Sequence, residues 1–387
     1  MYDGFRIFTL MNEPINPFSL SSYAGPETFC DRETETKRMV TNAVNGVNTT
    51  LLSTRRMGKT GLIYHVFHQL RKSRKAECVY ADIFATRDLR GLTNQLAGAI
   101  MKSFPEHKTL GKKFMILLKA LRPVISFNAL SGEPEVSLDF AQPKQFEQSL
   151  AGLLEFLENQ PIRIVVAFDE FQQIQTYPET NIEALLRTLI QPLKNVQFIF
   201  SGSNEHMLAE MFGSAKRPFF SSTQPVHLDA IAADKYSAFI QKLFGDSKRK
   251  IHPDAVEFIV YWTRLHTYYT QAVCNRLYST GAKDITLEFV RQQCNGLLKD
   301  QEGVFVQYRN LLTAVQWNLL RAIAGEDKVY QPSAGAFISK YQIGAPANIQ
   351  RGIEALMNKE MIFRTRDERG EYYRVSDCFL ARWLEGQ

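Results

Sequence analysis

The tripeptide Gly58-Lys59-Thr60 has the residue types and the setting of a phosphate-binding loop. A short apolar run, Thr50–Ser53, precedes it, and a helical pattern extends from Gly61 to about Lys72. A loop between a strand and a helix directs backbone N–H groups at a phosphate, while the lysine reaches the β and γ oxygens. The threonine hydroxyl supplies a ligand for Mg²⁺. The predicted nucleotide-binding residues of this loop are Ser53, Arg55, Arg56, Met57, Gly58, Lys59, Thr60 and Gly61.

Ser53 departs from the usual form of this loop, which has glycine five positions before Gly58. A serine fits there if its backbone can adopt the geometry that the loop requires. The alternative is a chance Gly-Lys-Thr sequence in an ordinary loop. The strand pattern before it and the helical pattern after it favour phosphate binding.

Two adjacent carboxylates follow an apolar run that is typical of a buried strand. The run Ile162–Phe168 leads directly into Asp169 and Glu170. A strand of a parallel sheet delivers its terminal side chains to the carboxyl edge, where phosphates bind. We predict that Asp169 holds Mg²⁺, directly or through water, and that Glu170 orients and polarises the attacking water. Alone, such a pair is more often a solvated turn, but the phosphate loop earlier in the chain favours catalysis.

A third polar stretch, Ser201-Gly202-Ser203-Asn204, ends the strand-like run Val196–Ser201. A polar side chain here can lie between the strand of the phosphate loop and the acidic strand, where it would sense the γ-phosphate. Asn204 and Ser201 are the candidates, and we predict that Asn204 belongs to the catalytic set. The alternative is that Ser203 or Asn204 caps the helix that follows.

Strand-like and helical segments alternate in the first part of the chain, which implies a parallel sheet with helices on both faces. A first helix is expected over Pro26–Thr50 and a strand over Glu77–Ile83. Between Phe104 and Pro143, a basic helix and a β-hairpin are typical of an insertion. The hairpin strands are expected over Val124–Phe127 and Val136–Phe140.

After Leu228 the strand-like runs stop and the pattern becomes helical. Near the C-terminus, three helices followed by two strands describe a winged helix-turn-helix. The helices are expected over Thr313–Ala324, Ala334–Tyr341 and Ala347–Lys359, and the strands over Met361–Thr365 and Tyr372–Val375. We predict an extended lead-in over residues 1–24, an α/β P-loop core over 25–228, a helical lid over 229–304 and a winged helix domain over 305–387.

The composition is that of a soluble globular protein of two or three domains, with 387 residues, 45% hydrophobic and 22% charged. No apolar run approaches the roughly 20 residues needed to span a membrane, and no secretory signal pattern is present. The net charge of +6 permits nucleic-acid contact without arguing strongly for it. The five cysteines fit neither a disulfide framework nor a zinc site, so we expect buried or free thiols in a reducing cytoplasm.

In combination, these motifs resemble the archaeal and bacterial AAA-type ATPases, close to the STAND signalling NTPases and the origin-recognition ATPases. The segments that carry the resemblance are Phe29-Cys30-Asp31-Arg32-Glu33, Ser53–Thr60, Phe168-Asp169-Glu170-Phe171-Gln172, Phe200-Ser201-Gly202-Ser203, and Tyr373–Phe379 with Trp383. The resemblance covers nearly the whole chain from Pro17 onward. It implies a nucleotide-binding core, a helical lid and a winged helix, and it places Phe29 and Arg32 near the adenine.

The sequence departs from this family's pattern at two places. An arginine that could act as a finger on a neighbour's phosphate is replaced by Ser222, which leaves Arg217 or Arg187 as alternatives. The family's Gly-Gly-x-Pro lid motif stands here as Leu265–Tyr269, where His266 either reaches a phosphate or belongs to the core. We therefore expect hydrolysis to be slow or to depend on a partner.

Two classes of function fit these features. The first is a Mg²⁺-dependent ATPase that acts as a molecular switch, in which bound ATP or ADP moves the lid and winged helix to expose a surface for a homo-oligomer or a protein partner. The second is a DNA-binding ATPase, a loader or regulator, that grips duplex DNA through the winged helix. The candidate DNA ligands are Asn348, Gln350, Arg351, Asn358, Lys359, Arg364, Arg366 and Arg369. Residues 305–387 hold 11 Lys and Arg against 9 Asp and Glu, which slightly favours the first class. A small-molecule kinase is weaker, because no arginine-rich lid follows the phosphate loop.

Overall fold

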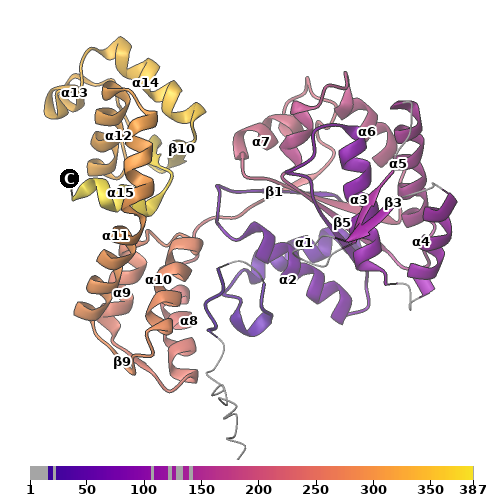
Figure 1. Cartoon of the computed structure of the whole chain (residues 1–387), viewed down its shortest axis with the longest axis horizontal. Helices are drawn as coiled ribbons and strands as arrows, with labels where there is room; N and C mark the ends of the chain where they lie inside the picture. Colours follow the sequence, from indigo (N-terminus) through magenta and orange to yellow (C-terminus); the bar gives the residue numbers. More distant parts are fainter. Residues whose placement is uncertain are drawn as a thin grey trace, which may run out of the picture. The chain divides into compact units, whose positions relative to one another are not determined.

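The computed structural model describes residues 16–20, 23–105, 109–120, 124–127, 134–138 and 143–386. The chain divides into two compact units. Residues 21–231 form the sheet unit, which contains a five-stranded sheet. Among the described residues, 16–20 and 232–386 form the helical unit. Figure 1 traces the elements of each unit along the chain.

The sheet unit is built on five parallel strands in the order β2-β5-β6-β1-β7. They are β1 (Thr49–Leu52), β2 (Glu77–Asp82), β5 (Ile164–Asp169), β6 (Val196–Ser201) and β7 (Gln224–His227). Strand β6 lies between β1 and β5, because Phe200 pairs with Thr50 on one side and with Phe168 on the other. This confirms the predicted parallel sheet and the predicted place of the third polar stretch. Strand β7 escaped prediction because it is short and only Val226 is buried.

Helices cover both faces of this sheet, as expected for parallel strands with near-continuous apolar sequences. Helices α1 (Glu33–Val44) and α2 (Lys59–Lys72) pack on the face to which Val165 and Ala167 point. Val166 and Phe168 point to the opposite face. That face is covered by α3 (Leu89–Ser103), α4 (Thr109–Ala120), α5 (Pro143–Glu158), α6 (Ile182–Ile190) and α7 (Glu205–Gly213). In Figure 1, α1 and α2 lie across the strands from α5 and α6.

The first helix is shorter than predicted. A 3₁₀ turn at Pro26–Thr28 is followed by left-handed backbone at Asp31 (φ 55°) and Arg32 (φ 72°), so α1 begins only at Glu33. It ends at Val44 rather than near Thr50. The left-handed conformation is incompatible with a right-handed helix, which explains the late start.

The insertion contains the predicted hairpin as antiparallel β3 (Val124–Phe127) and β4 (Pro134–Ser137). The predicted turn residues 131–133 and the predicted strand end at 139–140 lie outside the described residues. Of the predicted lead-in, residues 1–15, 21 and 22 also lie outside them. Residues 16–20 pack into the helical unit, where the buried Phe18 ring lies 5.0 Å from that of Phe244 and Asn16 donates a hydrogen bond to the Asn275 carbonyl.

The helical unit begins with four helices, α8 (Ala233–Asp246), α9 (Pro253–Trp262), α10 (Thr267–Ser279) and α11 (Leu287–Leu311). The expectation that strands stop after Leu228 is wrong in one detail. Two short strands, β8 (Lys250–Ile251) and β9 (Asp284–Ile285), pair in parallel after that residue. Two residues are too few to show a strand period in the sequence.

The C-terminal part of the helical unit is a winged helix. Its elements are α12 (Ala314–Glu326), α13 (Gly335–Tyr341), α14 (Pro346–Asn358), β10 (Ile362–Asp367), β11 (Gly370–Val375) and α15 (Cys378–Glu385). Three helices followed by an antiparallel hairpin confirm the predicted motif. Helix α11 runs without a break across the boundary predicted at residues 304 and 305, so the division between lid and winged helix stays a prediction.

All five cysteines are buried and none is disulfide-bonded, as expected. Among the residues that the structure describes, no helix combines the length and the apolar character needed to span a membrane.

Candidate functional site

The loop between β1 and α2 contains the residues of the predicted phosphate-binding loop. Within it, φ is positive at Arg56 (63°) and Gly58 (94°) but not at Ser53. Ser53 therefore needs no glycine-like backbone here, which explains how serine is accommodated. Helix α2 begins at Lys59, two residues before the predicted start at Gly61, because Gly58 itself is the N-cap residue.

Lys59 is held at this loop by two carbonyl groups. Its Nζ donates hydrogen bonds to the oxygen of Thr54 (2.9 Å) and to that of Ser53 (3.2 Å), and the side chain is only 7% exposed. Burial lowers the pKa of Lys59, while the negative charges of Asp169 and Glu170 oppose that shift. The ammonium group is thus desolvated and lies in the field of the two predicted carboxylates.

Asp169 accepts four hydrogen bonds, and three of them come from side chains on different elements. Its Oδ2 receives the hydroxyls of Thr60 (2.9 Å) and Tyr80 (2.7 Å). Its Oδ1 receives the Ser201 hydroxyl (2.6 Å) and the backbone N–H of Glu170 (3.1 Å). Since α2, β2 and β6 each supply one hydroxyl, the carboxylate is fixed at the meeting point of the phosphate loop and the sheet edge.

Glu170 has a separate set of partners. Its Oε2 accepts hydrogen bonds from the backbone N–H (3.0 Å) and hydroxyl (2.7 Å) of Ser203 and from the Gln172 amide (2.5 Å). Its backbone is left-handed, with φ 56°, which turns the chain sharply after β5. The adjacent carboxylates therefore sit in different surroundings. One faces Thr60, and the other is bound to the loop between β6 and α7.

Asn204 is the N-cap residue of α7, since its Oδ1 accepts a hydrogen bond from the backbone N–H of Met207 (3.0 Å). The structure therefore shows Asn204 in the capping role, which was the alternative for this residue. Its role in sensing the γ-phosphate stays a prediction. Of the two candidates in this stretch, Ser201 is the one whose side chain contacts Asp169.

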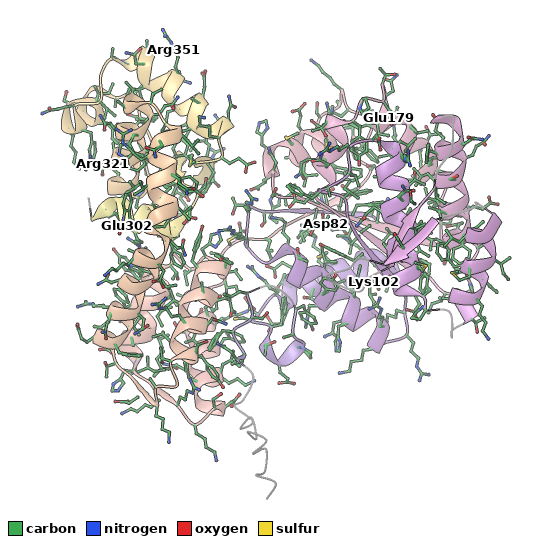
Figure 2. The ribbon with its side chains drawn as sticks, viewed as in Figure 1. Asp82, Lys102, Glu179, Glu302, Arg321 and Arg351 are labelled. Atoms are coloured by element: carbon green, nitrogen blue, oxygen red, sulfur yellow. The ribbon has the colours of Figure 1, made fainter. Side chains whose placement is uncertain are left out.

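Asp82 is a further carboxylate at the same edge, at the end of β2 and paired in register with Asp169. Its Oδ1 accepts the backbone N–H of Phe84 (2.9 Å), and burial, with the nearby Asp169 and Glu170, raises its pKa. Figure 2 labels Asp82 in the sheet unit. Asp82 was not among the predicted residues, because a lone acidic residue that ends a strand carries little signal in the sequence.

The segment before α1 supplies an aromatic group beside α2. The Phe29 ring stacks on the His65 ring, with centroids 4.3 Å apart and planes 12° apart. The Tyr23 hydroxyl lies 2.9 Å from His65 Nδ1. A methyl group added at Gly61 would lie 3.7 Å from Phe29, so this aromatic group lies next to the first turn of α2. His65 and Tyr23 escaped prediction, since neither belongs to a recognised motif.

Arg32 is only 5% exposed and pairs with Glu35 through Nη1 (3.1 Å). Its Nη2 is buried without a hydrogen-bond partner in the described part of the chain. A buried donor of this kind is costly unless a further acceptor satisfies it. Both predicted adenine-proximal residues, Phe29 and Arg32, thus belong to the sheet unit and precede α1.

The remaining predicted residues differ in exposure and partners. Arg55 and Arg56 are exposed in the phosphate loop, whereas Met57 is buried. Arg217 forms ion pairs with Glu183 and Glu210, so this candidate finger has partners within its own unit. His266 belongs to the helical unit, where its ring contacts that of Tyr269.

The winged helix exposes the predicted recognition helix α14. The predicted DNA ligands on and after this helix are all exposed, namely Asn348, Gln350, Arg351, Asn358 and Lys359, and so are the acidic residues Glu354 and Glu360. Arg351 points away from the protein in Figure 2. On the hairpin, Arg364 pairs with Glu371 (3.5 Å), whereas Arg366 and Arg369 are exposed. Neither of these two, nor Arg351, forms an ion pair with any described residue.

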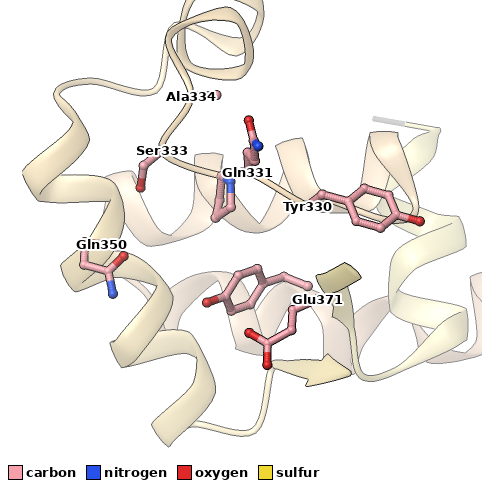
Figure 3. A pocket seen from close by; sticks show the side chains of 8 residues that line it. Tyr330, Gln331, Ser333, Ala334, Gln350 and Glu371 are labelled. Atoms are coloured by element: carbon pink, nitrogen blue, oxygen red, sulfur yellow. The ribbon is translucent and has the colours of Figure 1, made fainter. Parts of the chain in front are cut away.

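An open cavity of about 400 Å³ also lies in the winged helix (Figure 3). It is formed by the loop before α13, by α14 and by β11. Tyr330, Gln331, Gln350, Glu371 and Tyr373 are among its lining residues. None of the predicted nucleotide-binding residues lines it.

The residues at the sheet edge fit a nucleoside triphosphate with Mg²⁺ on chemical grounds. Gly58 provides the left-handed turn, and the first turn of α2 offers N–H groups without intrahelical partners. The Thr60 hydroxyl and the Asp169 carboxylate, 2.9 Å apart, are oxygen ligands of the kind that Mg²⁺ prefers. Lys59 supplies the positive charge.

Comparison with solved structures identifies the fold. The Walker-type ATPase PABY2304 of Pyrococcus abyssi superposes with a TM-score of 0.65 over 95% of this chain and 99% of that chain, at 17% identity. The ORC2 protein of Aeropyrum pernix, solved as ADPNP and ADP complexes, matches with a TM-score of 0.57 over 96% and 97% of the two chains, at 14% identity.

The chain has the fold of a Walker-type P-loop ATPase. A family described as "Probable winged helix domain" matches residues 303–386, in agreement with the three helices observed there and the hairpin that follows them. A search of curated protein sequences finds no match. The resemblance seen in the motifs is therefore confirmed at the level of the P-loop ATPase fold and its C-terminal winged helix.

Proposed function

We propose that the protein is a Mg²⁺-dependent ATPase that acts as a nucleotide-driven molecular switch. The observation that carries this proposal is the separation of two adjacent carboxylates. Asp169 is bound to Thr60 at the phosphate loop, and Glu170 is bound to Ser203 outside it. One carboxylate is thereby suited to hold a cation, and the other to act on water.

Each residue has a distinct part in this proposal. Lys59 binds the β and γ oxygens, and Thr60 with Asp169 holds Mg²⁺, which neutralises charge on the phosphates. Glu170 orients the attacking water and draws its proton. The aromatic group around Phe29 contacts the base.

The candidate finger residues support slow or partner-dependent turnover. Three donors hold Oε2 of Glu170 toward the loop between β6 and α7, which leaves Oε1 to accept a proton from water. Arg217 is ion-paired with Glu183, and the family's finger position is Ser222, whose hydroxyl donates to the Phe219 carbonyl. We infer that a second copy of the chain or another protein completes the site. The buried free cysteines are consistent with a cytoplasmic protein.

A DNA-binding ATPase is the second candidate, and one observation favours it. Arg351, Arg366 and Arg369 are exposed on the winged helix without ion pairs to described residues. Cations of this kind are available for the phosphates of duplex DNA.

The variant Lys59→Ala tests the proposed function, with Lys72→Ala as the control at the far, exposed end of the same helix. Calorimetric titration should show ATP binding by the wild type and by Lys72→Ala, and none by Lys59→Ala, because the ammonium offsets the charge of the phosphates. Unchanged ATP affinity in Lys59→Ala would remove the phosphate-loop assignment.

A further inference from the structure

Tyr80 has a polar contact that its place in the sheet does not require. It lies in β2, pairs in register with Ala167, and shares a face of the sheet with the buried Cys78. Its ring is 4.9 Å from the ring of Tyr64. A phenylalanine would make the same packing contacts, so the hydroxyl group has to be explained by what it binds.

The hydroxyl of Tyr80 binds Asp169. It donates to Oδ2 at 2.7 Å, which is shorter than the bond from Thr60 to the same oxygen. A hydrogen bond from a neutral donor to a carboxylate is stronger than one between neutral groups, and it fixes the direction of the acceptor. The ring packing against Tyr64 in turn limits where the hydroxyl can go.

The two oxygens of Asp169 are held from the strands on either side of β5. Tyr80 on β2 holds Oδ2, and Ser201 on β6 holds Oδ1. Thr60 is the remaining hydroxyl partner, and in the proposed function it would be a ligand of Mg²⁺. Tyr80 is then the side chain left to orient Oδ2.

We propose that Tyr80 is a positioning residue that sets the affinity of the site for its divalent cation by orienting Asp169. This role rests on the proposed function, because it presumes that Asp169 holds the cation. Outer-shell partners of metal-binding carboxylates typically change metal affinity about 10- to 100-fold when they are removed. Tyr80 should contribute at the lower end of that range, because Ser201 and the Glu170 N–H remain.

The test is Tyr80→Phe, with Tyr177→Phe as the matched control. Tyr177 is also a largely buried phenol of the sheet unit, but its hydroxyl bonds to Thr86 rather than to Asp169. The affinity for ATP is measured first in EDTA. Mn²⁺ is then titrated into the protein with ATP, and bound Mn²⁺ is followed by electron paramagnetic resonance. Thermal unfolding establishes that each variant is folded.

Tyr80→Phe should bind ATP in EDTA within about twofold of the wild type, while the Mn²⁺ concentration for half-saturation rises about tenfold. Tyr177→Phe should change neither quantity. Ser201→Ala removes the hydroxyl from the other oxygen and should shift half-saturation in the same direction, which provides a second variant if Tyr80→Phe does not fold.

Unchanged half-saturation in Tyr80→Phe, or an equal rise in Tyr177→Phe, would overturn the role of Tyr80. A wild type that binds no ATP under either condition would overturn the proposed function and this role together. The wild-type titration alone therefore distinguishes the two failures.

Discussion

The carboxyl edge of the sheet and the exposed face of the winged helix both carry polar residues that were predicted from the sequence. The two regions differ in whether these side chains contact one another. At the sheet edge, hydroxyls from α2, β2 and β6 converge on the single carboxylate of Asp169. On the winged helix, Arg351 and Arg366 point to solvent and pair with no described residue. The first region is preorganised around one point, and the second is an open distribution of charge.

This difference bears on how well each region indicates a function. Convergent, desolvated groups lose little freedom when they act, and their geometry restricts the chemistry that they can perform. Exposed arginines are equally compatible with a DNA backbone and with plain solvation, because surface charges are screened and mobile. The sheet edge therefore restricts the chemistry that can be proposed for it, whereas the winged helix shows only that positive charge is available.

Glu170→Gln should have the largest effect of the changes considered for this comparison. The amide keeps a similar shape but cannot take a proton from water, so turnover should fall by about 100-fold or more. ATP binding should remain. Parallel measurement of phosphate release and ATP affinity checks both parts, and wild-type turnover by Glu170→Gln would assign the water-orienting role to another group.

Replacing ATP by GTP tests the part of the proposed nucleotide site that would contact the base. The chain has no Asn-Lys-x-Asp segment to read the exocyclic groups of guanine, and the Phe29 ring offers stacking. We expect ATP to bind at least about tenfold more tightly than GTP, a difference of about 1.4 kcal/mol. Competition of GTP against bound ATP measures this, and equal affinity would contradict it.

The sequence was sufficient to predict the groups that lie in recognisable local settings. Gly58, Lys59, Asp169 and Glu170 each stand at the junction of an apolar strand with a turn or helix, and the parallel sheet brings those junctions to one edge. The winged helix was also predictable, because apolar residues recur along its helices and hairpin strands with clear periods.

The supporting residues were not predictable in the same way. Tyr80 has the sequence context of an ordinary strand residue, and its partner Asp169 is 89 positions away. His65 and Ser203 likewise acquire their contacts only when distant segments meet. Local patterns give the position of an element, but side-chain partners depend on the tertiary packing of several elements.

Ser203→Ala should have a smaller effect, opposite in sign to that of Glu170→Gln. It removes one hydroxyl donor to Glu170 Oε2 and leaves the Ser203 N–H and the Gln172 amide. Loss of this hydrogen bond, worth about 1 kcal/mol, leaves the negative charge of Glu170 less stabilised, so the carboxylate should accept a proton from water more readily and turnover should rise about fivefold. Steady-state ATP hydrolysis with ATP affinity as the reference checks this. A fall in turnover would mean that Ser203 holds Glu170 in its working orientation.

Arg351→Ala combined with Arg366→Ala is expected to have the smallest effect. The double substitution tests the exposed face of the winged helix. If the winged helix grips duplex DNA, the pair should weaken binding on every sequence. It should also flatten the slope of log K against log salt by up to about two units, one for each lost phosphate contact. Fluorescence anisotropy with a labelled duplex at several salt concentrations measures both effects.

The balance of charge around these arginines favours the other result for this experiment. On the same hairpin, Arg364 is paired with Glu371, and Asp367 is paired with Lys328 from the loop after α12 (2.8 Å), so several of the domain's cations are already neutralised. With 11 basic against 9 acidic residues over 305–387, we expect neither wild type nor variant to bind duplex DNA measurably at physiological salt. An ATP-dependent change in assembly that survives both substitutions would then assign the domain to the switch rather than to DNA, and salt-sensitive DNA binding lost in the variant would assign the exposed face to nucleic acid.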